Sequence, residues 1–273
     1  MIKLSIWSTI RDSYAFVWRG RRRFLSLAAP AVVILAIAST LVAWLAVTPA
    51  SADAENAMTG PAAVLLFLTM PVAVFLWLVF SVAWHRRFLV PGESVTVGAA
   101  LGWSRRHSRF LLLSIAVGLL IALVMVGGAL AAFAVSSLFG VGQEGLANDV
   151  FLPLYLVGLA CALVISGRLA LLFPAAAVDH RMTFGECWAT TRGNGWRLAI
   201  ILFLVAVPVW AVANLISAPI GYFGQSNSLT VILLAGLVDQ TLGFVGVAVG
   251  VTALSIAYRA IMGAQGRVSI TEE

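Results

Sequence analysis

Six long apolar runs alternate with short polar segments along the chain. A run of about 20 residues, rising ~1.5 Å per residue, crosses the ~30 Å hydrocarbon core of a bilayer as a helix. A helix is needed there because lipid offers no partner to backbone N–H and C=O groups. The pattern therefore predicts an all-α polytopic membrane protein with six transmembrane helices, at roughly residues 24–47, 62–84, 110–134, 151–173, 198–220 and 239–258.

The composition agrees with lipid as the main solvent. Of 273 residues, 62% are hydrophobic and 10% are charged, and the mean hydropathy is +1.03. A soluble domain is about half apolar and a quarter charged, and its surface could not accommodate this much apolar side chain. Cys161 lies in an apolar run and Cys187 in a basic segment. Because they fall at different depths, we expect no disulfide between them.

The positive charges lie on one side of the predicted membrane. All 17 Lys and Arg residues fall in segments 1–23, 85–109, 174–197 and 259–273, apart from Arg168 at the end of the fourth run. The alternate connections, 48–61, 135–150 and 221–238, contain none. Because basic residues are retained in the cytoplasm, we expect a multi-pass protein of the bacterial inner membrane with both termini cytoplasmic.

The basic side points to anionic lipid head groups as partners, with other membrane proteins as further partners. The pI of about 10.1 is also typical of nucleic-acid binding, but the orientation bias already accounts for these cations. We therefore expect no nucleic-acid partner and favour the charged lipid surface. The candidate head-group contacts are Arg22, Arg23, Arg105, Arg106, Arg109, Arg192 and Arg197.

A weak internal repeat divides the chain into three units. Arg23, Arg109 and Arg197 open the odd-numbered runs and lie 86 and 88 residues apart. A fixed period is typical of repeated structural units, and it predicts three helical hairpins within one integral membrane domain, residues 1–273. The pseudo-repeats would be 1–87, 94–173 and 183–260. Chance similarity between apolar sequences is the alternative.

The sixth run contains the polar pair Asp239 and Gln240. Asp239 lies 20 residues before Arg259, as Asp149 lies 19 before Arg168. This analogy favours Asp239 at the outer mouth of the helix, with residues 229–237 as a separate interfacial or re-entrant piece. The alternative places Asp239 and Gln240 near mid-membrane as an intramembrane polar site, where a carboxylate is costly and usually functional.

The basic segments are predicted to form short amphipathic helices at the membrane surface. The first carries an apolar stripe at Ile2, Ile6, Ile10, Tyr14 and Val17, which has helical spacing. In the third, Thr183 and Glu186 have capping-box spacing, which predicts a helix start. The inner boundary also carries tryptophans typical of an interfacial aromatic belt, namely Trp84, Trp188 and Trp196.

The chain contains no residue pattern typical of a catalytic, metal or cofactor site. His85, His107 and His180 lie beside arginines, so we expect solvated histidines rather than metal ligands. The G-x-G-x-x-G at residues 140–145 follows a predicted membrane helix instead of a strand, so we expect no dinucleotide there. We therefore predict no catalytic residues, no metal and no cofactor, and a protein that is not an enzyme.

One stretch carries a resemblance to a known family. Phe173-Pro174, Thr-Phe-Gly-Glu-x-Trp at 183–188 and Thr-Arg-Gly-Asn-Gly-Trp-Arg at 191–197 resemble multispanning bacterial membrane proteins of unsettled role. More distantly, the chain is similar to YciC-like proteins and to the membrane domain of some glycerophosphodiester phosphodiesterases. The resemblance implies a polytopic helical domain, and it carries no catalytic residue over to this chain.

These observations leave two functional hypotheses. The first is a non-enzymatic accessory or scaffolding protein that packs against lipid or a larger membrane complex. The second is a transporter or lipid-handling protein, which would use a polar cleft between the hairpins near Pro208, Asp239 and Gln240. A membrane enzyme would need polar residues from several helices to converge.

Overall fold

The computed structural model describes residues 3–47, 60–93, 96, 98, 101–138, 146–223 and 228–264. Within these ranges the chain is helical apart from short turns and contains no strand. The helices are α1 (Ile6–Arg19), α2 (Arg21–Val47), α3 (Gly60–Leu89), α5 (Arg105–Leu138), α6 (Leu146–Leu169), α7 (Leu172–Ala177), α8 (Phe184–Thr190), α9 (Gly195–Phe223) and α10 (Leu229–Gly263).

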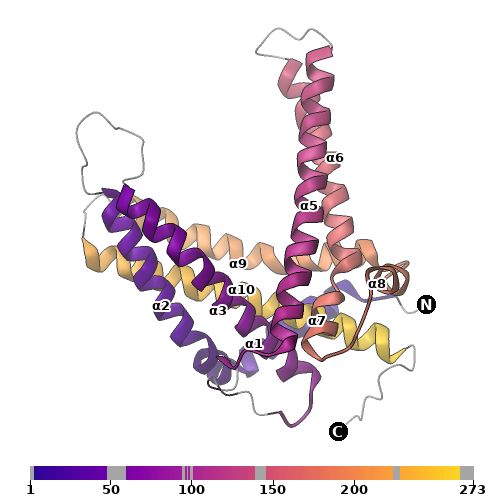
Figure 1. Cartoon of the computed structure of the whole chain (residues 1–273), viewed down its shortest axis with the longest axis horizontal. Coiled ribbons are helices and arrows are strands. Elements are labelled where there is room, and N and C mark those ends of the chain that lie inside the picture. Colours follow the sequence, from indigo (N-terminus) through magenta and orange to yellow (C-terminus); the bar gives the residue numbers. More distant parts are fainter. Residues whose placement is uncertain are drawn as a thin grey trace.

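Six of the described helical segments are long and apolar enough to cross a membrane, which confirms the predicted fold class. They pair in chain order as the hairpins α2–α3, α5–α6 and α9–α10. The short helices α1, α7 and α8 lie at the end where the long helices converge, which we call the base (Figure 1). The spans cover Arg21–Ala46, Gly60–Leu89, Arg105–Val135, Leu152–Ala177, Gly195–Ile216 and Leu229–Gly263.

The helix α10 is the centre of the packing, since it contacts α1, α2, α3, α7 and α9. Its Phe244 is fully buried and meets Phe80 of α3 edge to face, with ring centroids 5.1 Å apart. Phe80 in turn stacks on Trp84 at 5.7 Å, and Phe24 of α2 packs edge-on against both rings. This aromatic core joins two hairpins near the base.

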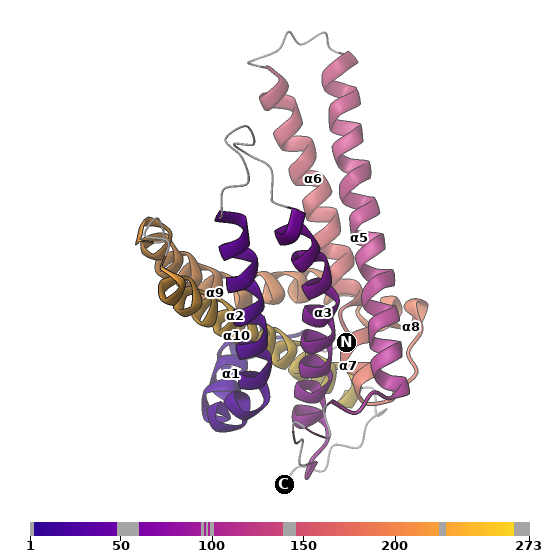
Figure 2. The same ribbon diagram turned by 60° about the vertical axis from the view of Figure 1, so that its left-hand side comes forward.

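The hairpin α5–α6 leans away from the other four long helices in Figure 1, and in Figure 2 its outer part extends beyond α2 and α3. It meets the rest through α3, α7, α8 and α9 at the base, and its two helices pack mainly on each other. A Cβ on Gly128 of α5 would lie 3.3 Å from the Cα of Gly158 in α6. Glycines therefore allow the two helices to approach closely, as is typical of helix pairs in membranes.

The seam between α6 and α9 is tighter still. A Cβ on Gly167 would lie 2.5 Å from the carbonyl oxygen of Gly195 and 2.8 Å from the backbone nitrogen of Ala199. Gly167 is buried, and its missing side chain is what admits the backbone of α9. This crossing fastens the α5–α6 hairpin to the third hairpin.

The expected break before Asp239 is wrong, because α10 is one unbroken helix from Leu229 to Gly263. Residues 229–237 continue the helix, and Gly236 packs on α2, where a Cβ would lie 3.1 Å from Ser39 Oγ. At 35 residues and ~1.5 Å per residue the helix is about 52 Å long, which exceeds the ~30 Å hydrocarbon thickness. It therefore has to tilt or extend beyond the bilayer, and α9 and α10 run at a steep angle to α5–α6 in Figure 1.

The helix α1 forms as predicted, and its apolar stripe of Ile6, Ile10, Tyr14 and Val17 packs against the protein core together with two small polar residues, while Ile2 lies outside the described residues. Thr9, Ser13 and Val17 are the buried residues, while Ile6, Ile10 and Tyr14 are half-buried beside them. The hydroxyls of Thr9 and Ser13 donate to the carbonyls of Ser5 (2.7 Å) and Thr9 (2.6 Å), so burial leaves neither hydroxyl unpaired. Small polar side chains allow α1 to pack against α9 and α10 rather than lie loosely on the lipid surface.

Candidate functional site

The base is the part of the protein where polar and charged side chains gather. Arginines at the ends of the long helices donate to backbone carbonyls of neighbouring elements. Arg197 donates to Leu4 O at 2.7 Å, and Arg259 donates to Phe88 O. The Tyr14 hydroxyl donates to Val205 O at 2.7 Å, which ties α1 to α9. Burial raises the pKa of Tyr14, so the phenol stays protonated and keeps this bond at neutral pH.

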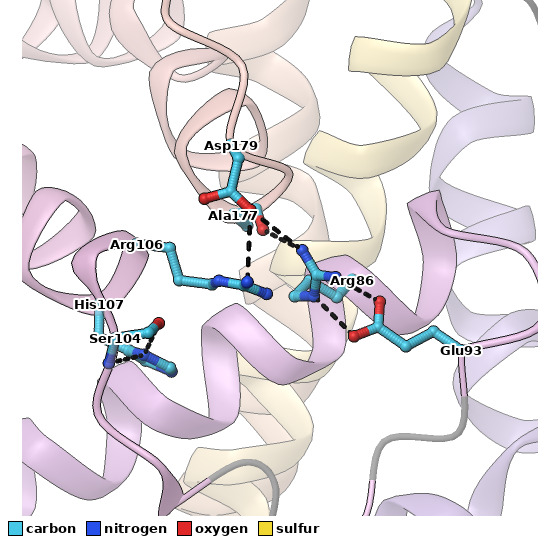
Figure 3. Close-up of polar contacts among 7 residues, drawn as sticks. All are labelled: Arg86, Glu93, Ser104, Arg106, His107, Ala177 and Asp179. Atoms are coloured by element: carbon cyan, nitrogen blue, oxygen red, sulfur yellow. Dashed lines mark hydrogen bonds and ion pairs between the residues drawn. The ribbon is translucent and has the colours of Figure 1, made fainter.

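An ion-pair cluster joins α3, α5 and the turn after α7 (Figure 3). Arg86 pairs with Glu93 at 2.7 Å and with Asp179 at 3.6 Å, and Arg106 pairs with Asp179 at 3.4 Å. Arg86 also donates to Ala177 O at 3.2 Å. Asp179 has a φ of 60°, a conformation that Asp and Asn tolerate better than most residues. The cluster positions the α5–α6 hairpin against α3 and occupies Arg106, a predicted head-group contact.

The three histidines are less solvated than predicted. His85 is 1% exposed and its Nδ1 lies 2.8 Å from the Ser255 hydroxyl. His107 is 5% exposed and its Nδ1 lies 2.8 Å from the Ser104 hydroxyl (Figure 3). The expectation of solvated histidines is therefore wrong for these two, because both are buried and bond a hydroxyl, which α10 supplies to His85 and which the residue Ser104, just before α5, supplies to His107. Among the described residues, no group of three His, Cys, Asp or Glu side chains is placed to hold a metal ion.

Two other sequence expectations meet different outcomes at the base. Trp188 and Trp196 are 44% and 59% exposed, but Trp84 is fully buried and donates to the Thr252 hydroxyl at 2.9 Å. Trp84 is thus a core residue and not part of an aromatic belt. Thr183 and Glu186 form the predicted capping box at the start of α8.

The two cysteines are both free, as predicted. Cys187 is buried in α8, and its thiol donates to Arg168 O at 3.3 Å. Burial is the main reason that its pKa rises to about 11. The thiol therefore serves as a small packing group at neutral pH.

An arginine-lined hollow lies where α1 passes into α2 beside the end of α3. Its volume is about 390 Å³, and Gly20 lies in its wall. A Cβ on Gly20 would lie 2.8 Å from Arg87 Nη2, so the absence of a side chain at Gly20 leaves room for that guanidinium. Arg87 also lies over the ring of Trp84 at 4.8 Å, and its Nη1 is buried without a hydrogen-bond partner. The arginines that line the hollow are Arg19, Arg21, Arg22, Arg23 and Arg87.

The predicted head-group residues do not form one site. Arg22 and Arg23 line the hollow, whereas Arg105 and Arg192 are exposed elsewhere at the base. Arg109 is half-buried. Sequence reasoning missed the remaining lining residues, Arg19, Arg21 and Arg87, although one signal was available. The start of one helix of a hairpin and the end of the next share one face of the membrane, so the run at 19–23 and the pair at 86–87 are the two open ends of one hairpin and fall on the same side.

A second candidate region surrounds the polar pair of α10. Asp239 and Gln240 both line a cavity of about 400 Å³ between α9 and α10, beside Trp77. Asp239 also lines a cavity of about 270 Å³ with Ser39 and Thr40 of α2. Pro208, the third residue expected at this cleft, is exposed and does not line these cavities.

Comparisons with protein-family models, with curated proteins and with solved structures gave no match to this chain. Any function therefore has to be argued from the residues at the base and around Asp239.

Proposed function

We propose that this protein is a non-enzymatic accessory or scaffolding component of the bacterial inner membrane. Its basic base would contact anionic lipid head groups, and its apolar arms would pack against lipid or the helices of a larger complex. The observation that carries the proposal is the divergence of the hairpins. They are joined at the base, and α5–α6 leans away from the others (Figure 1).

The outer part of α5 presents a continuous apolar face. The exposed residues recur at helical spacing and include Leu112, Leu119, Leu123, Leu130 and Phe133, each more than 60% exposed. On α6, Val157 is 59% exposed. Either lipid or a partner helix can cover such an apolar surface. A partner helix packs closely when small residues lie at the contact. An arm anchored only at its base is suited to receive such a partner.

The orientation follows from the charges of the base, since basic residues are retained in the cytoplasm. The test is cysteine-accessibility labelling in intact cells of variants carrying Glu144→Cys or Arg192→Cys. We expect a membrane-impermeant maleimide to label position 144 from outside and position 192 only after lysis. Equal labelling of both positions from outside would refute this orientation.

The scaffolding role is tested by photo-crosslinking in native membranes. A photoreactive residue at Leu123 or Val157 is expected to give crosslinks to a membrane protein that also co-purifies with the full chain. The matched control is Val117, on the same helix α5 but 4% exposed, which should crosslink only within the chain. Crosslinks to lipid alone from both exposed sites, with a monomer on native purification, would contradict the proposal.

The alternative is a transporter or lipid-handling protein that uses the cavities around α10. The observation in its favour is that Asp239 faces hollows bordered by α2 and α9, so a polar group can reach it from two sides. An ionisable group in such a place is a usual mark of a transport pathway. Flux through proteoliposomes that is unchanged by Asp239→Asn would count against this function.

A further inference from the structure

We propose that the arginine-lined hollow at the α1–α2 junction is a binding site for a ligand with two phosphate charges, carried by a lipid head group. The inference deepens the proposed contact with anionic lipid and rests on the base lying at the membrane surface. The proposed function needs only a basic surface, whereas this inference requires one defined site for a head group with two charges.

The positive charge of the hollow is not compensated. Five arginines line one hollow of about 390 Å³. Among the described residues, no carboxylate forms an ion pair with any of the five, whereas Arg86 and Arg106 at the same base are both paired. Arg23 repels Arg87 across the hollow. An anion relieves this repulsion, and a head group with two charges relieves more of it than a head group with one.

The position of Arg87 also favours an anion. Its guanidinium lies against Gly20 and over Trp84, which holds the group in place without neutralising it. Its Nη1 is buried and has no acceptor. A buried donor without a partner is costly, and guanidinium groups match phosphate oxygens with two parallel hydrogen bonds. Because Arg87 lines the hollow, a phosphate there lies beside this uncompensated guanidinium and can accept from it.

Exposed apolar side chains next to the arginine run favour a lipid over a soluble anion. Trp18 at the end of α1 is 71% exposed, and Leu25 on the first turns of α2 is 53% exposed. They flank the arginine run in sequence and present apolar surface next to it. Acyl chains can therefore lie on the protein while the phosphates enter the hollow. A soluble diphosphate would use the arginines and leave this apolar surface uncovered.

The test is native mass spectrometry of the full-length protein in non-ionic detergent, titrated with three lipids. These are cardiolipin, with two phosphates, phosphatidylglycerol, with one, and zwitterionic phosphatidylethanolamine. We expect cardiolipin to bind roughly tenfold more tightly than phosphatidylglycerol, because it makes an additional charge-assisted contact. Inorganic diphosphate is added as a competitor. Displacement of cardiolipin at millimolar diphosphate would support the same site and show that a free anion also enters it.

Two variants separate the hollow from the general positive charge. Arg87→Gln removes one guanidinium, and Gly20→Ala keeps all five but places a Cβ where the Arg87 guanidinium lies. Both should lower the preference for cardiolipin to within about threefold. The matched control, Arg181→Gln, loses one exposed arginine outside the hollow and should keep the preference. If Arg87→Gln fails to fold, Arg22→Gln tests the same hollow from an exposed position.

Equal affinity for cardiolipin and phosphatidylglycerol would overturn the inference, as would equal losses in Arg87→Gln and Arg181→Gln. Neither result bears on the scaffolding role, which is tested by crosslinks to other proteins from Leu123 and Val157. Conversely, the absence of a protein partner together with loss of the cardiolipin preference in Gly20→Ala would support the lipid site and contradict the scaffolding role.

Discussion

The seam between α6 and α9 gives the sharpest prediction about stability, through the substitution Gly167→Ala. The new Cβ would lie 2.5 Å from Gly195 O and 2.8 Å from Ala199 N, where about 3.4 Å is ordinary contact. Both neighbours are backbone atoms, so no side chain can move aside. The two helices would have to separate locally by about 0.9 Å (3.4 − 2.5), and the close packing of the seam would be lost.

The expected magnitude is that of an overpacked core, about 1–3 kcal/mol. A gain in helix propensity of about 1 kcal/mol opposes it, because alanine replaces glycine inside a helix. Gly118→Ala in α5 is the matched control, since nothing lies within 4 Å of its added Cβ. Both variants gain the propensity term, so the difference between them isolates the steric cost. We expect Gly167→Ala to be less stable than Gly118→Ala by about 1–3 kcal/mol.

The assay is reversible unfolding of the purified protein in mixed micelles of non-ionic detergent and dodecyl sulfate, followed by circular dichroism and tryptophan fluorescence. Gly167→Ala should unfold at a lower dodecyl sulfate fraction than the wild type, and Gly118→Ala at an equal or higher fraction. If the two variants unfold together, the backbones of α6 and α9 do not approach as described, and the attachment of the α5–α6 hairpin needs another explanation.

Three further predictions concern the base. The Cys187 thiol should react slowly with a maleimide at pH 8 and rapidly after unfolding, because burial raises its pKa from 9.0 to about 11. Equal labelling of folded and unfolded protein at pH 8 would contradict this burial. The contribution of the buried thiol to stability is complete below pH 9 and is lost as the pH rises towards 11. Asp179→Asn should lower the free energy of unfolding by less than about 1 kcal/mol, since the carboxylate is 57% exposed and asparagine tolerates the positive φ, whereas Asp179→Val should cost more, as a chemical denaturation series would show. Trp84→Phe should cost about 2–4 kcal/mol, because it leaves a cavity in the core and removes the N–H that donates to the Thr252 hydroxyl. A loss below about 1 kcal/mol in the same assay would mean that Trp84 is not a core residue.

The predictions that succeeded rest on local physics. The apolar runs were expected to be helices, since a segment that crosses lipid has to bond its own backbone. The capping box of Thr183 and Glu186 formed because both partners lie within one helical turn. The unpaired state of Cys161 and Cys187 followed from their depths along separate helices.

The predictions that failed concern which neighbour a residue meets. His85 and Trp84 read as boundary residues, but α10 supplies Ser255 and Thr252 to bond them. The break expected before Asp239 is absent, since α10 continues through residues 229–237 and packs on α2 at Gly236. None of these contacts joins residues that are close in the chain.

The order of apolar and basic segments was enough to establish six membrane-crossing helices, their pairing as hairpins and the gathering of cations at one end, because each follows from the transfer of single segments into lipid. The unbroken course of α10, the divergence of α5–α6 and the enclosure of Arg87 between Gly20 and Trp84 were settled by packing between helices. Such packing depends on small residues that meet across a crossing, and a hydropathy pattern does not tell which glycine will face which backbone.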